Sequence, residues 1–143
     1  MNKDGIHTTN YFNTFIEVAE DTQVSSGTKP LAKGGKQTVA MRQYELLVNN
    51  PYQFTSDDIF FLVFAEKNHL TQEALAAARK DFFSKGQPCF RASPLTKIYG
   101  FGVHADNEGK VALWGMETEK YQQLANDPTI QKVKAMRTSK KSK

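Results

Sequence analysis

Apolar side chains recur at helical spacing in two parts of the chain. The first part predicts a helix over residues 39–49, with Thr38 as its N-cap. The second predicts a helix over residues 72–84, with Thr71 as its N-cap and Gly86 closing its C-terminus. The expected buried stripes are Ala40, Tyr44, Leu47 and Val48 in the first helix and Ala74, Leu75, Ala78 and Phe82 in the second.

Three other stretches have the composition of β-strands. Residues 11–20 are rich in β-branched and aromatic side chains. One face of that strand is expected to hold Phe12, Thr14, Ile16 and Val18. The run 59–65 is apolar without alternation, which predicts a central strand buried on both faces. Residues 98–115 predict an antiparallel hairpin around the turn-forming residues 106–109.

The pairing of this hairpin depends on the length of its loop. With four residues in the loop, Ala105 would pair with Lys110, and Phe101 would face Trp114. This register places aromatic side chains together on one side of the hairpin.

The other side of the hairpin carries Gly100 and Gly102, followed by His104. Two glycines at alternate positions of a strand remove side chains where another group comes close. A packed helix is the commoner explanation, most simply the small-residue stripe of residues 74–78. A bound ligand, with His104 at the end of its groove, is the alternative.

The remaining segments complete a mixed architecture. We expect a long mobile loop over residues 21–37, a short third helix over 117–125 and an edge strand over 130–136. Helices and strands with at least one antiparallel pair define the α+β class. The expected organisation is one domain over residues 1–131 and a basic, disordered tail over residues 132–143.

The prediction of a basic tail depends on where the charged residues lie along the chain. The chain has 19 basic and 15 acidic side chains, a net charge of +4. Six of the basic ones lie in the tail: Lys132, Lys134, Arg137, Lys140, Lys141 and Lys143. Without these six, 13 basic side chains remain against 15 acidic ones. Any nucleic-acid binding is therefore expected to be weak, non-specific and confined to the tail.

Compartment and cofactors follow from what the sequence contains. Cys89 is the single cysteine, so no internal disulfide is expected. No secretory signal and no apolar run of membrane-spanning length is recognised, which predicts a cytoplasmic protein without membrane association. His7, His69 and His104 are far apart in sequence, so we expect no metal site. No motif predicts a cofactor.

The stretch 86–104 contains the clearest candidates for a site. A guanidinium, an ammonium and hydroxyl groups in one stretch suit a carboxylate or a phosphate. We therefore expect a binding module for an anionic small molecule, a peptide or a protein partner. The candidate ligand-binding residues are Arg91, Ser93, Lys97, Tyr99 and His104. The alternative is a solvated loop in which Ser93 and Pro94 begin a turn.

An enzymatic function is the competing hypothesis. Cys89 would be the nucleophile, and His104 would be its base if the fold brought the two together. The structural alternative is that Cys89 is a small apolar side chain in the core.

Five segments together resemble a known family. They are residues 8–21 (TTNYFNTFIEVAED), 50–58 (NPYQFTSDD), 82–97 (FFSKGQPCFRASPLTK), 99–104 (YGFGVH) and 135–137 (AMR). The chain resembles a family of small uncharacterised bacterial proteins, the domain of unknown function 6157. The resemblance covers nearly the whole chain except the tail, and it implies one intact domain. The family has no established activity, so no catalytic residue is carried over from it.

Overall fold

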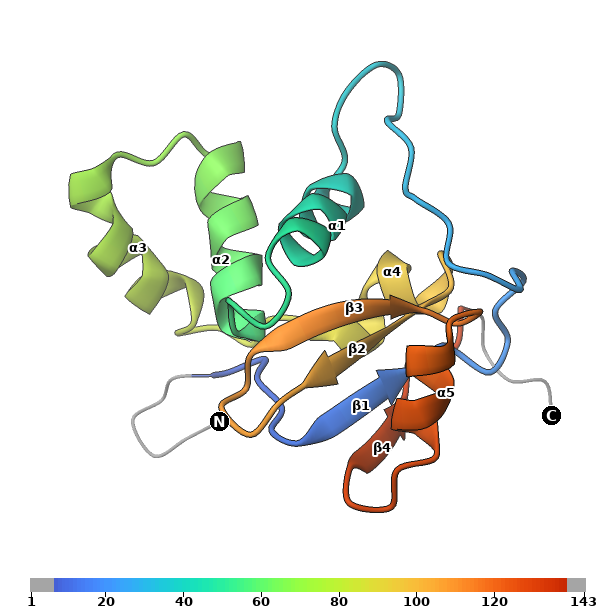
Figure 1. The fold of residues 1–143 in the computed structure, drawn as a ribbon. Coiled ribbons are helices and arrows are strands. Elements are labelled where there is room, and N and C mark those ends of the chain that lie inside the picture. Colours follow the sequence, from blue (N-terminus) through green and yellow to red (C-terminus); the bar gives the residue numbers. More distant parts are fainter. Residues whose placement is uncertain (1–6, 139–143) are drawn as a thin grey trace, which may run out of the picture.

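The computed structural model describes residues 7–138, and a four-stranded mixed sheet lies at its centre (Figure 1). The strands are β1 (Thr14–Glu17), β2 (Phe101–Ala105), β3 (Val111–Gly115) and β4 (Gln131–Lys134). Their order is β3-β2-β1-β4. Strand β2 is antiparallel to both β3 and β1, whereas β4 runs parallel to β1. The expected α+β class is confirmed.

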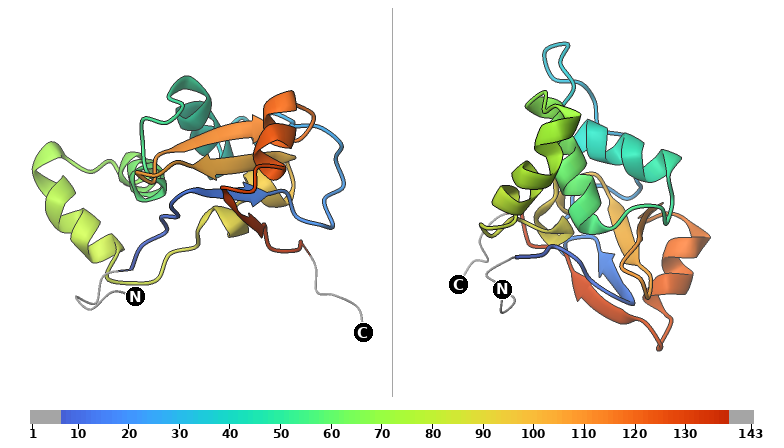
Figure 2. Two further views of the ribbon diagram at one scale, coloured as in Figure 1. Left: turned by 60° about the horizontal axis from the view of Figure 1, so that its bottom comes forward. Right: turned by 90° about the vertical axis from the view of Figure 1, so that its left-hand side faces the viewer.

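Helices cover both faces of this sheet. They are α1 (Val39–Asn49), α2 (Ser56–Lys67), α3 (Leu75–Phe82), α4 (Pro94–Lys97) and α5 (Glu119–Ala125), with 3-10 turns at Gln72–Ala74 and Phe90–Ala92. The main core joins Leu47 of α1, Ile59 of α2 and Leu95 of α4 to Val103 of the sheet. A second cluster on the opposite face joins Phe15 to α5 (Figure 2, right).

Helix α1 has the predicted bounds, and Thr38 caps it by accepting a hydrogen bond from the backbone N–H of Met41. Its buried face is turned slightly from the expected one. Gln43 and Leu46 are buried, whereas Val48 is 47% exposed. Leu46 and Leu47 both belong to the main core, so the buried face of α1 includes these two residues and leaves Val48 outside it.

The predicted strand 59–65 is wrong, because these residues belong to helix α2. Thr55 and Asp58 form a capping box: the Thr55 hydroxyl accepts from the Asp58 N–H, and the Asp58 carboxylate accepts from the Thr55 N–H. Helix α2 packs on the main core through Ile59 and on α3 through Phe61. Because it is covered on several sides, its apolar residues show no helical period.

The predicted helix 72–84 is present as a 3-10 turn followed by α3, which ends at Phe82, two residues before the expected end. Thr71 occupies the N-cap position of the turn, but its side chain makes no capping hydrogen bond. No residue of α3 is fully buried. This helix is therefore an outer layer on α2 (Figure 1).

The hairpin is confirmed, but its register differs by one residue from the expected one. Ala105 pairs with Val111, and Gly102 pairs with Trp114. The Asp106 N–H donates to the Lys110 carbonyl, so the loop is one residue shorter than expected. Gly109, at φ +82°, takes the left-handed conformation that closes such a three-residue loop.

The space beside the two glycines is occupied in two different ways, by side chains at Gly102 and mainly by loop backbone at Gly100. A Cβ at Gly102 would lie 2.6 Å from Cζ of Phe15 and 2.8 Å from Cε2 of Tyr121 in α5. A Cβ at Gly100 would lie 2.5 Å from the Ser26 carbonyl oxygen. The expected helix is therefore present only at Gly102, where α5 contributes Tyr121, whereas loop residues 24–26 fill the space at Gly100; the assignment to residues 74–78 is wrong.

The strand predicted over 11–20 is confirmed in its centre as β1. Phe12 does not share the predicted face, because its side chain is 56% exposed. Asn13 has a φ of +48°, which interrupts the extended backbone just before the strand. Phe15 and Ile16 are both buried, on opposite faces of the sheet.

The end of the chain is part of the sheet. Strand β4 confirms the expected edge strand, and the expected helix 117–125 is present as α5. Residues 132–138 of the predicted tail belong to the fold, because Ala135 is buried and the Thr138 N–H donates to the Asp21 carboxylate. The rest of the predicted tail, residues 139–143, lies outside the described residues.

Residues 21–37 form a loop with one isolated bridge, between Lys33 and Lys36. No helix within residues 7–138 combines the length and the apolar character that a bilayer crossing requires.

Candidate functional site

An apolar groove of about 310 Å³ lies between α1, α2, the end of α3 and the segment 87–94. We call it the α1–α2 groove and define it by Val39 of α1, by Phe60, Val63 and Phe64 of α2, by Phe82 of α3, and by residues of the segment 87–94. The three α2 residues are spaced i, i+3 and i+4, so they lie on one face of the helix.

Aromatic contacts hold the walls of this groove. The Phe64 and Phe82 rings lie 4.7 Å apart and join α2 to α3. The Phe60 and Phe90 rings lie 4.6 Å apart and join α2 to the 3-10 turn after Cys89. Phe64 is 36% exposed and Val39 is 43% exposed, so the mouth of the groove presents apolar surface to solvent.

The segment 87–94 forms the opposite wall, and its conformation is held by local hydrogen bonds. The Gln87 side-chain amide donates to the Phe82 carbonyl. Ser93 is the N-cap of α4, where its hydroxyl accepts from the Leu95 N–H, and Pro94 occupies the first turn. The Ser93 hydroxyl also donates to the buried Gln43 side chain of α1 at 3.3 Å. These hydrogen bonds fix the conformation of this wall of the groove.

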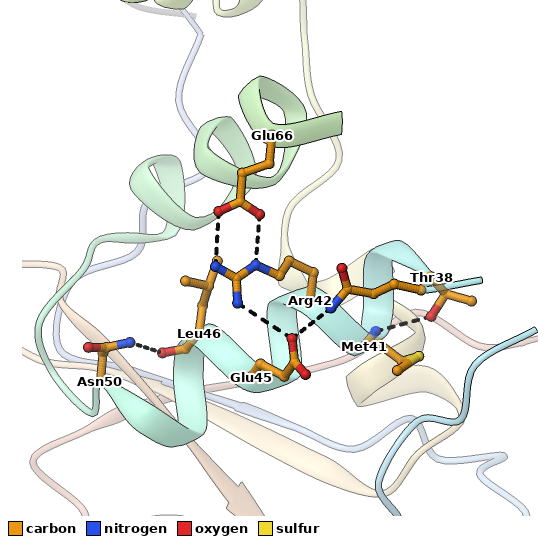
Figure 3. Close-up of polar contacts among 8 residues, drawn as sticks. Thr38, Met41, Arg42, Glu45, Leu46, Asn50 and Glu66 are labelled. Atoms are coloured by element: carbon orange, nitrogen blue, oxygen red, sulfur yellow. Dashed lines mark hydrogen bonds and ion pairs between the residues drawn. The ribbon is translucent and has the colours of Figure 1, made fainter. Parts of the chain in front are cut away.

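A second hollow of about 280 Å³ adjoins the groove, with which it shares Val39, Val63 and Lys67. It is more polar, because Arg42 and Glu66 form a bidentate ion pair there with N···O distances of 2.7 and 2.9 Å (Figure 3). The hydrogen bond from Arg42 lowers the pKa of Glu66, which keeps this carboxylate ionised. We call this second cavity the polar hollow.

Among the predicted site residues, Ser93 lines the groove, and so does Cys89, the candidate nucleophile. The Cys89 Sγ lies 3.7 Å from the Tyr11 hydroxyl, and burial together with this contact raises the pKa of Tyr11. The described contacts of Cys89 do not include His104. The nucleophile–base pair therefore stays a prediction that no described contact supports.

The other predicted binding residues of the loop do not line the groove. The Arg91 Nε–H donates to the Lys134 carbonyl, and the Arg91 backbone carbonyl accepts from the Met136 N–H. These two hydrogen bonds attach the loop to the end of β4. Tyr99 is half-buried and packs against the main core. Lys97 is half-buried in the last turn of α4. The described contacts do not bring these three side chains together around one site.

His104 lies on the face of the sheet that α5 covers, in a chain of hydrogen bonds with Tyr52 and Trp114. The Trp114 Nε1–H can only donate, and it does so to the Tyr52 oxygen at 3.2 Å. The Tyr52 hydroxyl also forms a hydrogen bond with Nδ1 of His104, at 2.7 Å, whose direction depends on the tautomer of the imidazole. Within residues 7–138, the Tyr52 hydroxyl is the hydrogen-bond partner described for the His104 ring.

Metal binding can be judged for the described residues. Among residues 7–138, no three side chains of the His, Cys, Asp and Glu types lie together in a way that could hold a metal ion.

The α2 face of the groove was missed by the sequence analysis, because residues 59–65 were assigned to a strand. One local signal could have found it: Thr55 and Asp58 have the spacing of a capping box, which predicts the start of a helix just before these residues.

Comparison with known proteins places the chain in a family. A family model described as a family of unknown function (DUF6157) matches residues 6–141. The chain belongs to the DUF6157 family. The resemblance found in the sequence is thereby confirmed. No curated protein and no solved structure matches the chain.

Proposed function

We propose that this DUF6157 protein is a binding module that takes the apolar part of a small molecule into the α1–α2 groove. The groove volume, about 310 Å³, carries the proposal. Small-molecule sites have volumes of roughly 300–1,000 Å³ and are mostly apolar, with a few fixed polar groups. Here three phenylalanines supply the apolar surface, and the hydrogen-bonded Ser93–Gln43 pair supplies fixed polar groups.

The energetic reason for binding is the exposed apolar surface at the mouth of the groove. Val39 and Phe64 are among the few large apolar side chains of the described residues that are more than a third exposed. Covering such surface contributes about 25 cal/mol for each Å² removed from water. A ligand that covers both side chains and fills the groove therefore gains from the hydrophobic effect.

The proposal keeps the expected binding function but moves the site. Of the residues 86–104, the segment 87–94 forms one wall of the groove, and Ser93 is the predicted ligand-binding residue on it. The proposed ligand contacts do not involve Arg91, Lys97, Tyr99 or His104.

Titration with 1-octanol, a neutral apolar probe, tests this proposal. We expect the backbone NMR signals of residues 60–67 and 87–94 to shift on addition of octanol. The substitution Val39→Trp fills the mouth of the groove and should weaken octanol binding by about tenfold, which corresponds to about 1.4 kcal/mol.

The matched control is Val48→Trp, on the same helix. Val48 is 47% exposed, close to the 43% of Val39, but it does not line the groove. It should leave octanol binding unchanged. The proposal is wrong if octanol leaves the groove signals unshifted, or if the two variants weaken binding equally.

A further inference from the structure

The α1–α2 groove and the polar hollow adjoin each other and differ in their chemistry. Val39, Val63 and Lys67 line both. In the groove the neighbours of a ligand are Phe60, Phe64 and Phe82, and in the polar hollow they are Gln37, Arg42 and Glu66. A ligand long enough to span both would therefore need an apolar body and a polar head.

The charges around the polar hollow favour a negative head. Glu66 is neutralised by its bidentate pair with Arg42, which also contacts Glu45 at 3.4 Å (Figure 3). Lys67 remains as a positive charge at the junction of the two cavities, and within residues 7–138 no ion pair is described for it. The three charged side chains that line the hollow carry a net charge of +1, and Glu45, which contacts Arg42 from outside the lining, brings the cluster to zero. Lys67 is therefore the group that favours a negative head.

The N-terminus of α1 lies at the same place and adds to this field. Thr38 and Val39, the N-cap and first residue of the helix, both line the polar hollow. The first turn of α1 has no acidic side chain to compensate its dipole. A helix N-terminus favours a negative charge beside it.

We propose that the ligand of the groove is an amphipathic carboxylate, with its apolar body beside the phenylalanines and its carboxylate beside Lys67 in the polar hollow. This inference rests on the proposed function. A single negative charge matches the one cation of the hollow without a described ion pair, Lys67, better than the double charge of a phosphate does.

Three probes with the same eight-carbon chain and different heads test this assignment: octanoate, 1-octanol and octylammonium. At pH 7 and low salt we expect octanoate to bind about two- to fivefold more tightly than octanol, the range of a partly exposed ion pair, and octylammonium to bind most weakly. Added salt should reduce the advantage of octanoate. Affinities are measured by NMR titration of the groove signals.

The variant Lys67→Met should reduce the ratio of octanoate affinity to octanol affinity to about one, whatever its effect on the affinity for octanol itself, and Lys67→Glu should make octylammonium the better ligand. The control is Lys97→Met, which removes a lysine that does not line either cavity and should change nothing.

The outcomes separate this inference from the proposed function. If octanol shifts no groove signals, the groove is not an apolar site and both proposals are wrong. If all three probes bind equally well, or if Lys97→Met and not Lys67→Met removes the octanoate preference, the carboxylate assignment is overturned and the apolar site stands.

Discussion

At the scale of single residues, the Trp114–Tyr52–His104 chain connects parts of the sequence that are far apart. Tyr52 belongs to the connection between α1 and α2 and has a positive φ of 58°. Its backbone N–H donates to the Val111 carbonyl, and its hydroxyl contacts His104 and Trp114. The residue thus attaches the α1–α2 connection to the hairpin by both backbone and side chain.

The environment of His104 predicts a pH dependence of stability. Burial, and next the positive charge of Lys120, lower the pKa of His104 below its usual 6.5, while Asp106 and Asp127 act in the opposite direction. Between the two values the unfolded chain binds more protons than the folded protein. The free energy of unfolding should therefore fall as the pH drops from about 6.5 towards the folded-state pKa, and the contribution of His104 should be complete above 6.5.

Urea unfolding of the wild type and of His104→Gln between pH 7.5 and 5 measures this effect. The wild type should lose more stability over this range than the variant does. A parallel NMR titration of the imidazole should show a higher His104 pKa in Lys120→Ala, because a positive charge is removed. Equal pH slopes in wild type and His104→Gln would contradict the assignment.

At the scale of elements, helix α2 supplies one wall of the groove, and local hydrogen bonds determine where this helix begins. The Thr55–Asp58 capping box satisfies two backbone N–H groups, and Asp58 also pairs with Arg79 of α3 at 2.9 Å. The position of Phe60, Val63 and Phe64 on the groove side follows from where this helix begins.

Thr55→Ala should lower the free energy of unfolding by about 1 kcal/mol, the usual cost of losing an N-cap side chain. Thr71→Ala is the matched control, because Thr71 stands at an N-cap but makes no side-chain capping bond. Its effect should stay within about 0.5 kcal/mol, as for other surface substitutions. Both are measured by urea denaturation, and equal effects would show that the Thr55 cap adds nothing.

At the scale of the whole molecule, the protein has two cores on the faces of the sheet and a third cluster between α2 and α3. The buried members of this third cluster are Phe61, Ala65 and Phe83, and α3 itself has no buried residue. An element with little buried surface opens at a lower free-energy cost than the central strands. Because Phe82 of α3 lines the groove, this opening would also loosen one groove wall.

Hydrogen exchange tests this division of stability. The backbone amides of Leu75–Phe82 should exchange faster than those of Phe101–Ala105. Addition of octanol should slow the exchange of α3, because the bound probe contacts Phe82. Exchange of α3 as slow as that of β2 would contradict the expectation.

The candidate site can be predicted from the sequence only in part. The sequence predicts a site in the stretch 86–104, and one part of that stretch, the segment 87–94, forms a wall of the groove. Arg91 instead contacts the end of β4, 43 residues away along the chain. Such contacts leave no trace in the spacing of neighbouring residues.

The sequence by itself determined the elements whose signals lie within a few residues: α1 with its Thr38 cap, the hairpin with Gly109 in its turn, α5 and the edge strand β4. Only the tertiary structure decided that residues 59–65 are helical, because burial on several sides removes the polar face that marks a helix in sequence. It also decided the groove, which exists only where α1, α2, α3 and the segment 87–94 meet.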